Sequence, residues 1–449
     1  MTLLFDRYSK NYLHIAIPAA LESLFMILLA SADLIMVGTL GTVAVAAVSI
    51  FLQPRLIILC FSRSLAAGVT LLVSRQAGQG DMSKSADILK KSLFVGTLVL
   101  VPLHILFFIY LEPIFYLLGA SAEYMAPALD YGRIAVVSVF ITSLTLVFQA
   151  VQLGFGQTSV IMKTNVLGNI VNVVINGILI FGLGPFPRLG VTGAAIGTVA
   201  STVFTLGWTM LIMKKDRLFI GGSYLPTKAY FRSIGPVFAS IFSEQGAERI
   251  GMVLFTRMAA GLGTVPFAVH SICMNICDIY YDYVMGLGKA SMVLAGQSCG
   301  KGSQKDWAAY FKSGLVWSLL FSTVAFVLTF VFRDQIFGIY NSDPESVAMA
   351  GVIMIFVAVV SYPEAHTIVC AGVLRGSGRT GAVAAYSFFS ITVLRPIMTA
   401  FFMYYLGWGL IGTWTALLLD QCIRATCSSV LLWRVFKMPW DRVLAKVNV

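Results

Sequence analysis

Apolar runs long enough to cross a membrane recur along this 449-residue chain, and they restrict its fold more than any other feature. A helix needs about 20 mostly apolar residues to span the hydrocarbon of a bilayer. Hydrophobic residues make up 58% of the chain and charged residues 11%, whereas about a quarter of a typical soluble domain is charged. We therefore predict an all-α integral membrane protein surrounded by the lipid bilayer.

The apolar runs divide into twelve predicted transmembrane helices. The first is expected to be a span and not a cleavable signal peptide, because it is too long and contains two carboxylates. The approximate cores of the spans are residues 12–38, 45–74, 88–112, 127–152, 160–184, 190–213, 230–259, 266–298, 308–332, 346–374, 382–406 and 408–436.

Lysine and arginine residues gather in alternate loops, and this pattern sets the expected orientation. They are frequent after spans 2, 6, 8 and 10 and in the C-terminal tail, whereas on the opposite side only Arg188 and Arg333 stand out. Positively charged loops stay in the cytoplasm, so both termini are predicted to be cytoplasmic in a plasma or bacterial inner membrane. The formal charge of +11 is then an orientation signal, and nucleic-acid binding is not expected.

The sequence repeats itself at an offset of 222 residues. The segment "LGTVAVAAVSI" begins at Leu40 and "LGTVPFAVHSI" at Leu262, and seven of their eleven positions match. We predict two homologous six-helix lobes, 1–213 and 230–449, joined by a cytoplasmic linker at 214–229. Six spans in each lobe give both lobes the same orientation, a parallel repeat that in transporters places the substrate between the halves.

Polar side chains inside the spans of the first lobe are candidates for a functional site, because an ionisable residue is costly in hydrocarbon. Glu22 and Asp33 are eleven residues apart and share one helical face. Four asparagines of span 5 form a stripe at i, i+4, i+7 and i+11. Such a stripe can join helices, but four amides favour a polar cavity: Asn165, Asn169, Asn172 and Asn176.

Asp33 is the expected centre of a cation site. Within its lobe, the arginines Arg55 and Arg63 of span 2 are its nearest candidate partners in the sequence, and without them the carboxylate must hold a proton or a cation. The amides of span 5 and the hydroxyl of Thr198 are oxygen donors, which together with a carboxylate suit Na⁺. The pattern does not choose between Na⁺ and H⁺, and either ion would give two states between which the protein switches.

The second lobe repeats this pattern with more charge. Span 7 contains Glu244 and Glu248, and Glu364 lies in span 10. Asp420 and Arg424 are expected to pair at i, i+4, and Glu248 and Asp420 are expected only to neutralise arginines. Span 8 carries polar residues at i, i+3, i+7 and i+14, namely Asn275, Asp278, Asp282 and Lys289.

No cofactor is expected, and no metal site beyond a possible Na⁺ at Asp33. The seven cysteines contain no CxxC pair and lack the histidines that would complete a zinc site. No HExxH, GxSxG or Walker sequence appears, and the loops are too short for a soluble catalytic domain. We therefore expect a transporter driven by an ion gradient, and not an enzyme.

Six segments together resemble the MATE family, the multidrug and toxic compound extrusion antiporters, over nearly the whole chain. They are "AALESLFMILLASADLIMVGTLGTVAVAAVSI" (19–50), "LVSRQAGQGD" (72–81), "QLGFGQTSVIMKTNVLGNIVNVVINGILIFG" (152–182), "LGVTGAAIGTVAS" (189–201), "SEQGAERIGMVLFTRMAAGLGT" (243–264) and "LRGSGRT" (374–380). The resemblance implies a V-shaped pair of six-helix bundles that exports small organic compounds, cationic and amphipathic, in exchange for Na⁺ or H⁺. A monomer is expected.

The resemblance also assigns the cation site. Asp33, Asn172, Asn176 and Thr198 match the positions of the family's site in the first lobe. One branch of the family has aspartate at the position of Asn176, so the asparagine here is similar to the NorM-like branch more than to the DinF-like branch.

In the second lobe, Glu244 matches the acid that the NorM-like branch has in span 7, and Glu244 and Glu364 are predicted to couple ion and substrate. Glu364 stands where that branch has aspartate, eleven residues before Arg375, and is a conservative departure. Asp278 and Asp282 fit no motif of the family, so they are candidates either for coupling and substrate binding or for a structural ion-pair network.

Three other functions stay open. A flippase or exporter of a lipid-linked or anionic cargo in the same superfamily would have more spans or a basic central cavity. A major-facilitator carrier should have a basic GxxxDRxGRR-like loop after span 2, where this chain reads "SRQAGQGDMSKSADILKK". An ion channel, outside the transporters, would carry current with no dependence on an organic substrate.

Overall fold

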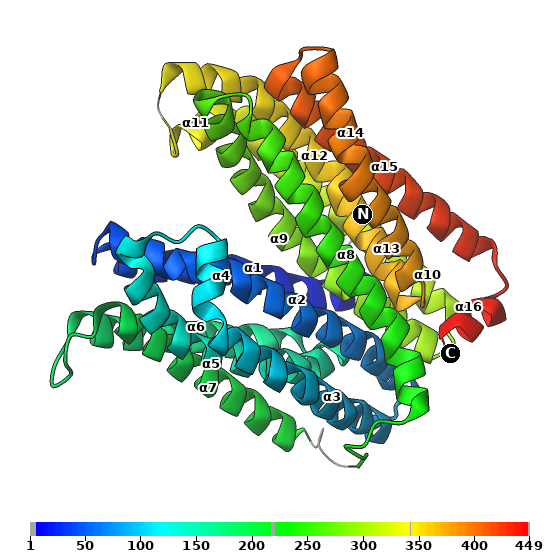
Figure 1. Ribbon diagram of the computed structural model, residues 1–449. Helices are drawn as coiled ribbons and strands as arrows, with labels where there is room; N and C mark the ends of the chain where they lie inside the picture. Colours follow the sequence, from blue (N-terminus) through cyan, green and yellow to red (C-terminus); the bar gives the residue numbers. More distant parts are fainter. Residues whose placement is uncertain (1–5, 217–220, 342, 448–449) are drawn as a thin grey trace. The chain divides into compact units, whose positions relative to one another are not determined.

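The computed structural model describes residues 6–216, 221–341 and 343–447 and confirms the all-helical class (Figure 1). No strand occurs among these described residues. The elements are α1 (Arg7–Gly38), α2 (Thr42–Gln79), α3 (Met82–Ile109), α4 (Leu111–Leu117), α5 (Ala122–Gly154), α6 (Thr158–Phe181), α7 (Gly190–Lys215), α8 (Lys228–Ala260), α9 (Thr264–Gly300), α10 (Gln304–Val331), α11 (Arg333–Gly338), α12 (Pro344–Gly376), α13 (Thr380–Phe388), η1 (Phe389–Leu394), α14 (Arg395–Ala400), η2 (Phe401–Tyr405), α15 (Gly409–Lys437) and α16 (Trp440–Val447).

Corresponding helices confirm the internal repeat. The bounds of α3 and α10, and those of α5 and α12, differ by the predicted offset at both ends. The turns before α3 and α10 also match, because Gly80 has φ 77° and Gly302 has φ 70°, left-handed values that favour glycine. Each turn is followed by a capping side chain: Asp81 accepts a hydrogen bond from the backbone N–H of Lys84, and Ser303 from that of Asp306.

Ten helices in the described part of the chain are long and apolar enough to cross a membrane. The predicted spans 7 and 8 correspond to α8 and α9, which have the length but are not among the ten. Acids such as Glu244, Glu248 and Asp278 lie in their central turns and lower their apolar character. Together with these two, the long helical segments coincide with the twelve predicted spans.

One of these spans is irregular. The segment from Thr380 to Tyr405 alternates between the α-helices α13 and α14 and the π-helical segments η1 and η2. Pro396 lies at the start of α14, where its missing N–H removes a helix hydrogen bond. Such π-helical turns often occur at functional sites, and here they flank Arg395.

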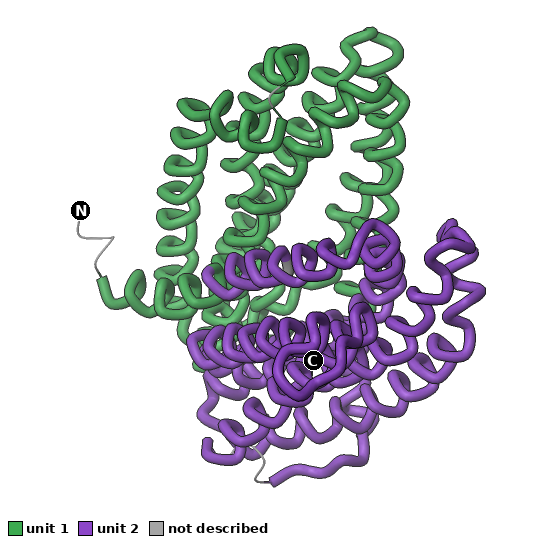
Figure 2. The backbone as a smooth tube through the Cα atoms, turned by 90° about the vertical axis from the view of Figure 1, so that its left-hand side faces the viewer, with its two compact units in different colours: residues 1–20, 239–449 green, residues 21–238 purple. Residues whose placement is uncertain are grey.

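The described chain packs as two compact units, one formed by 21–238 and the other by 1–20 with 239–449 (Figure 2). In the second unit, Tyr12 anchors the beginning of α1, because its hydroxyl donates to the carbonyl of Leu287 at 2.8 Å and lies 2.8 Å from the hydroxyl of Ser291. The lobe boundaries at 213 and 230 stay a prediction, and residues 217–220 of the linker lie outside the described residues.

Each unit has its own buried core with aromatic contacts. In unit 21–238, the ring of Phe51 lies 5.7 Å from that of Phe107 and 5.6 Å from that of Tyr131. In the other unit, the ring of His270 lies 5.3 Å from that of Phe255 and 5.9 Å from that of Trp414. Stacked and edge-to-face contacts of this kind add to the packing free energy of a core, which holds the polar residues of the spans in fixed positions.

Candidate functional site

Helices α1 and α6 pack with their residues in register. Asn165 donates to Glu22, Asn169 donates to the sulfur of Met26, and Asn176 donates to Asp33, each across a separation of 143 residues. A constant separation means that the two helices run parallel along this contact. The asparagine stripe therefore faces α1, and it brings both predicted acids of the first span onto one polar seam.

The Asp33 cluster is the centre of this seam. The amide nitrogen of Asn176 lies 2.9 Å from Asp33 Oδ1. Asn172, with its amide oriented so that donor meets acceptor, places its nitrogen 2.5 Å from Oδ2 and 2.9 Å from Oδ1. Both asparagines are buried, and Asp33 is half-buried. Hydrogen bonds to a carboxylate stabilise its charged form, whereas burial opposes the charge.

The cluster also offers oxygen to a cation. The side-chain oxygen of Asn176 is buried and has no hydrogen-bond partner among the described residues, although buried polar atoms are nearly always paired. A carboxylate and amide oxygens are the hard donors that Na⁺ prefers, but in this arrangement the amides of Asn172 and Asn176 turn their nitrogens to Asp33. The residue types present thus fit a monovalent cation, and the cation site stays a prediction.

Gly197 of α7 makes room for Asn176. A methyl group added at this glycine would lie 1.9 Å from the side-chain oxygen of Asn176 and 3.2 Å from its backbone nitrogen. No real carbon atom can approach an oxygen so closely, so any larger residue at 197 must turn the amide of Asn176 away. The glycine is therefore part of the site, although only its position beside Asn176 in the fold reveals this.

Gly197→Ala should weaken ion dependence without unfolding the protein. Turning the Asn176 amide removes one charge-assisted contact to Asp33, so the Na⁺ or H⁺ concentration for half-maximal efflux is expected to shift roughly tenfold. The measurement is the ion dependence of substrate efflux from proteoliposomes. Gly207→Ala is the matched control on the same helix, because a methyl group there would meet nothing within 4 Å. Equal ion dependence of the two variants would exclude Gly197 from the site.

Thr198 lies near the cluster but uses its hydroxyl proton elsewhere. Its Oγ1 donates to the carbonyl of Ala194 at 2.8 Å, which leaves only lone pairs for another partner.

Tyr131 of α5 lies next to Thr198 and within electrostatic reach of Asp33 and Arg55. The described residues show no direct ion pair between Arg55 and Asp33. Sequence reasoning missed Tyr131, because nothing in its local sequence indicates that it lies beside the cluster.

Glu22 belongs to a second polar group on the same seam. The amide nitrogen of Asn165 lies 2.5 Å from Glu22 Oε1, and Gln149 of α5 donates to Asn165 Oδ1 at 2.7 Å. Asn169 uses its amide on Met26 and on the carbonyl of Asn165. Gln149 is a further buried residue that sequence reasoning missed. A glutamine within the last turn of the predicted span 127–152 was the signal that could have found it.

In the second lobe, Glu244 forms an ion pair with Arg375, with Nη2 of the arginine 2.7 Å from Oε2 of the acid. The side chains are 11% and 23% exposed, so the pair is largely removed from solvent. It joins α8 to the end of α12. Glu244, predicted to couple ion and substrate, therefore already has a cationic partner in this arrangement.

Asp420 is neutralised by Arg395 and not by Arg424. Nε and Nη2 of Arg395 lie 3.0 Å and 2.5 Å from Asp420 Oδ2, and the hydroxyl of Ser390 donates to Oδ1. The expected neutralising role of Asp420 is confirmed, but the predicted i, i+4 partner is wrong. Arg424 instead lies within electrostatic reach of Tyr386, Glu248 and Glu244, besides Asp420. A pair between helices replaces the pair within α15.

The remaining acids of the second lobe gather around Glu364. This buried carboxylate accepts a hydrogen bond from Gln421 at 3.3 Å and lies within electrostatic reach of Asp278, Glu248 and Arg424. Asp278 also lies within reach of Asp282. The structure thus brings together the predicted acids of α9 and α12.

Asn275 lies outside this acidic group. It is exposed, one turn before Asp278 on α9, and it has no described hydrogen-bond partner. An accessible amide here can contact a solute, as can the exposed carboxylate of Asp278.

Comparison with known proteins identifies the family. The MatE family model matches residues 18–178 and 236–401. A relative named "Probable multidrug resistance protein NorM" from Thermotoga maritima is 24% identical over 419 residues, which cover 93% of this chain and 90% of the relative. "Multidrug resistance protein NorM" from Vibrio cholerae is 26% identical over 86% of each chain. A crystal structure of MATE in the bent conformation is similar with a TM-score of 0.88, at 20% identity, over 100% of this chain and 98% of that one.

Two repeated lobes of membrane-spanning helices, with polar residues buried between those helices, define a multi-pass membrane transporter. Proteins of this class move solutes and do not catalyse a reaction. The chain belongs to the MatE family of such transporters, which confirms the family resemblance and the predicted fold class, and the names of its relatives agree with the NorM-like branch.

Proposed function

We propose that this transporter is a secondary active multidrug exporter, which exchanges cytoplasmic amphipathic organic cations for Na⁺ or H⁺ by alternating access of its two lobes. The observation that carries the proposal is the Asp33 cluster, in which one carboxylate of α1 meets two buried asparagines of α6. The names of the relatives, which are multidrug resistance proteins, support export of several small compounds. No cofactor is required besides the coupling ion.

The coupling step follows from the hydrogen bonds of the cluster. An ionised Asp33 accepts from the amides of Asn172 and Asn176. A bound Na⁺ or H⁺ neutralises the carboxylate and competes with these donors, so the amides must turn their oxygens toward the ion or leave. Since an ion shifts a conformational equilibrium only by its difference in affinity for the two states, this rearrangement between α1 and α6 is where coupling would arise.

Acidic side chains of the second lobe would supply the negative charge that binds a cationic cargo. The acidic group of Glu364, Asp278 and Asp282 offers carboxylates to a cationic compound, and Glu244 would exchange its bond to Arg375 for a proton or for substrate. Asn275 of this lobe, and the seam residues Glu22 and Asn169 of the first lobe, are further candidates to contact solute, each within its own lobe. This division gives the first lobe the ion and the second lobe the cargo.

The test is efflux of ethidium from proteoliposomes under an imposed Na⁺ gradient or an imposed pH gradient. Gradient-driven efflux is expected with one of the two, and that gradient identifies the ion. A current without ethidium in the same liposomes would instead indicate a channel. Efflux of an anionic dye but not of ethidium would favour the flippase or anionic-cargo function and contradict the proposal.

We further propose that the protein is a monomer in the plasma or bacterial inner membrane with both termini in the cytoplasm. The alternating positive loops support this orientation. In a variant whose seven native cysteines are replaced by alanine, a single cysteine placed in the tail, Arg442→Cys, should resist a membrane-impermeant thiol reagent in intact cells and react in permeabilised ones. Reaction in intact cells would reverse the orientation.

A further inference from the structure

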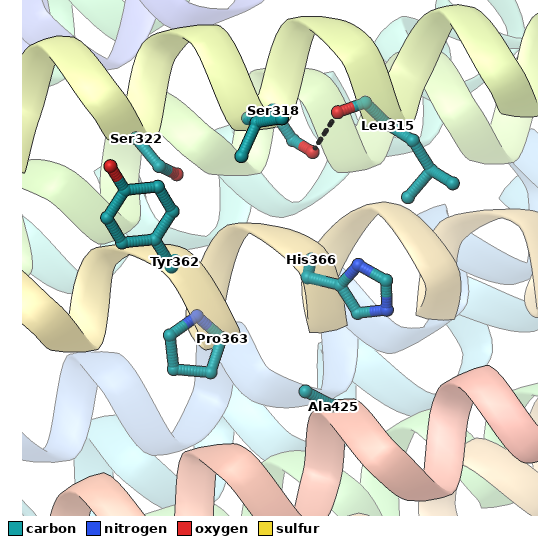
Figure 3. Close-up of a pocket in the computed structure, with 8 residues that line it drawn as sticks. Leu315, Ser318, Ser322, Tyr362, Pro363, His366 and Ala425 are labelled. Carbon is teal, nitrogen blue, oxygen red and sulfur yellow. Dashed lines mark hydrogen bonds between the residues drawn. The ribbon is translucent and has the colours of Figure 1, made fainter.

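A cavity of 390 Å³ lies inside the second lobe, between α10, α12 and α15 (Figure 3). Its volume falls within the range of about 300–1,000 Å³ that is usual for small-molecule sites. Its polar lining residues are Ser318 and Ser322 of α10 and Tyr362 and His366 of α12. None of them belongs to the Asp33 cluster or to the acidic group of Glu364.

The cavity opens toward lipid at the middle of the membrane. Ser318, Pro363 and Ala425, which line it, lie close to the midpoints of α10, α12 and α15. Leu319, another lining residue, is 60% exposed, and Val324, five residues further along α10, is also exposed. Exposed apolar side chains at the middle of a membrane-spanning helix contact hydrocarbon, so a ligand reaches this cavity from the bilayer.

The internal repeat shows how the cavity arises. The position of Ser322 corresponds to Leu100 in the first lobe, where the leucine is fully buried. Pro363 corresponds in the same way to Ile141. Replacing a leucine by serine and an isoleucine by proline removes side-chain volume from a packed interior, and the space remains because neighbouring side chains relax only partly. At these two positions the second lobe therefore carries less side-chain volume than the first.

The hydrogen bonds favour one tautomer of His366. The hydroxyl of Ser429 donates to the carbonyl of Ala425 at 2.8 Å. His366 Nε2 lies 2.6 Å from the same hydroxyl oxygen and 3.4 Å from Cys370 Sγ, so with the Ser429 proton on Ala425 the tautomer that satisfies this contact carries its proton on Nε2. A neutral imidazole has one N–H, which leaves Nδ1 as an acceptor on a ring that lines the cavity (Figure 3). In the first lobe the corresponding residue is Leu144, which has no polar atom in its side chain.

The other polar groups of the cavity are acceptors for the same reason. The hydroxyl of Ser318 donates to the carbonyl of Leu315 at 2.9 Å, as the dashed line in Figure 3 shows, and that of Ser322 donates to the carbonyl of Ser361 at 3.0 Å. The hydroxyl of Tyr362 donates to Thr323 Oγ1 at 3.2 Å. With these protons bound inside the protein, only lone pairs remain for a ligand.

We propose that this cavity is a second, lipid-accessible binding site for an amphipathic organic molecule whose hydroxyl or N–H group donates a hydrogen bond to His366 Nδ1. Its apolar part replaces the side chains that fill the first lobe. The site stands independently of ion-coupled efflux, because Glu364, which follows Pro363, turns away from the cavity to Gln421.

The experiment uses a photoreactive probe, a trifluoromethyl-diazirine derivative of benzyl alcohol, on the full-length protein in phosphatidylcholine nanodiscs without any ion gradient. Mass spectrometry should locate saturable adducts on the segments 315–322 and 362–366. The methyl ether of the same probe has no donor. Its half-saturation should need roughly 2- to 13-fold more probe, the factor expected for one neutral hydrogen bond. Adducts that do not saturate, or equal labelling by alcohol and ether, would overturn the proposal.

Variants separate the cavity from the lipid-facing surface around it. Ser322→Leu restores the residue of the first lobe and should lower adduct yield at least roughly tenfold because it fills the space. Ala425→Leu fills it from α15 and gives a second route if the first variant folds poorly. His366→Leu, which also restores the residue of the first lobe, should keep labelling but remove the preference for the alcohol. Val324→Leu is the surface control and should label like the original protein. Unchanged labelling in both filled variants would exclude the cavity.

A negative labelling result can be distinguished from a failure of the proposed transport function. The labelling needs no gradient and no substrate movement, so a protein without efflux can still bind the probe. Conversely, efflux that Asp33 controls can persist when the probe finds no site.

Discussion

Asp33→Asn is expected to abolish ion-coupled efflux and to leave the transporter folded. Asparagine keeps nearly the same shape and an oxygen that can accept from Asn176, which lies 2.9 Å away. The negative charge is lost, and the charge of the ligands governs the affinity of an oxygen site for a hard cation. The initial rate of gradient-driven ethidium efflux from proteoliposomes should therefore fall roughly 100-fold or more.

Two controls distinguish lost coupling from lost structure. Met26→Leu changes the same seam between Glu22 and Asp33 without changing charge, and its efflux should match that of the original protein. Ethidium binding to Asp33→Asn, measured by fluorescence anisotropy, should stay within about threefold, since this proposal places the cargo acids in the other lobe. Coupled efflux at the original rate in Asp33→Asn would show that the ion binds elsewhere.

The sequence alone predicts the spans, the repeat and the Asp33 cluster, and each for a physical reason. Only long apolar helices can cross the hydrocarbon core of a bilayer in a protein of this class. The spans therefore appear in the sequence as long runs of apolar residues. Residues three, four, seven and eleven apart share a helical face, so Asn172 and Asn176 could be placed on one side of α6. A carboxylate in such surroundings needs polar partners, which the same stripe provides.

The contacts between helices are the part that sequence spacing could not predict. Spacing within α15 suggested that Asp420 pairs with Arg424, yet Asp420 bonds to Arg395, which is 25 residues away on another helix. Glu244 and Arg375 are 131 residues apart, and nothing in either segment indicates the other. Gly197 affects the site because Asn176 lies opposite its Cα. This contact depends on how α6 and α7 pack.

Asp420→Asn is expected to destabilise the protein strongly. Asp420 and Arg395 have side-chain exposures of 0% and 3%, so the arginine would keep its charge in a buried site without a carboxylate. Removing one partner of a buried ion pair typically costs about 3–5 kcal/mol of the free energy of unfolding. Phe255, whose ring centroid lies 5.6 Å from the guanidinium carbon, offers the arginine a cation–π contact that offsets only part of this loss.

The measurement is the free energy of unfolding in mixed detergent, followed by tryptophan fluorescence. Glu244→Gln is the comparison, because its pair with Arg375 is more exposed and water can solvate the arginine that remains. A smaller loss is expected there. If Asp420→Asn and Glu244→Gln destabilise equally, burial does not set the cost of the pair.

The double variant Asp420→Leu with Arg395→Met tests whether the pair itself stabilises the lobe. Replacing a buried ion pair by apolar residues of similar volume is often neutral or stabilising, so this variant should recover most of the stability that Asp420→Asn loses. The hydroxyl of Ser390 would then lose its carboxylate acceptor, and it lies within η1, between α13 and α14. Recovered stability together with slower efflux would mean that the pair holds the π-helical turns in the shape that transport needs. Recovered stability with unchanged efflux would assign the pair to folding alone.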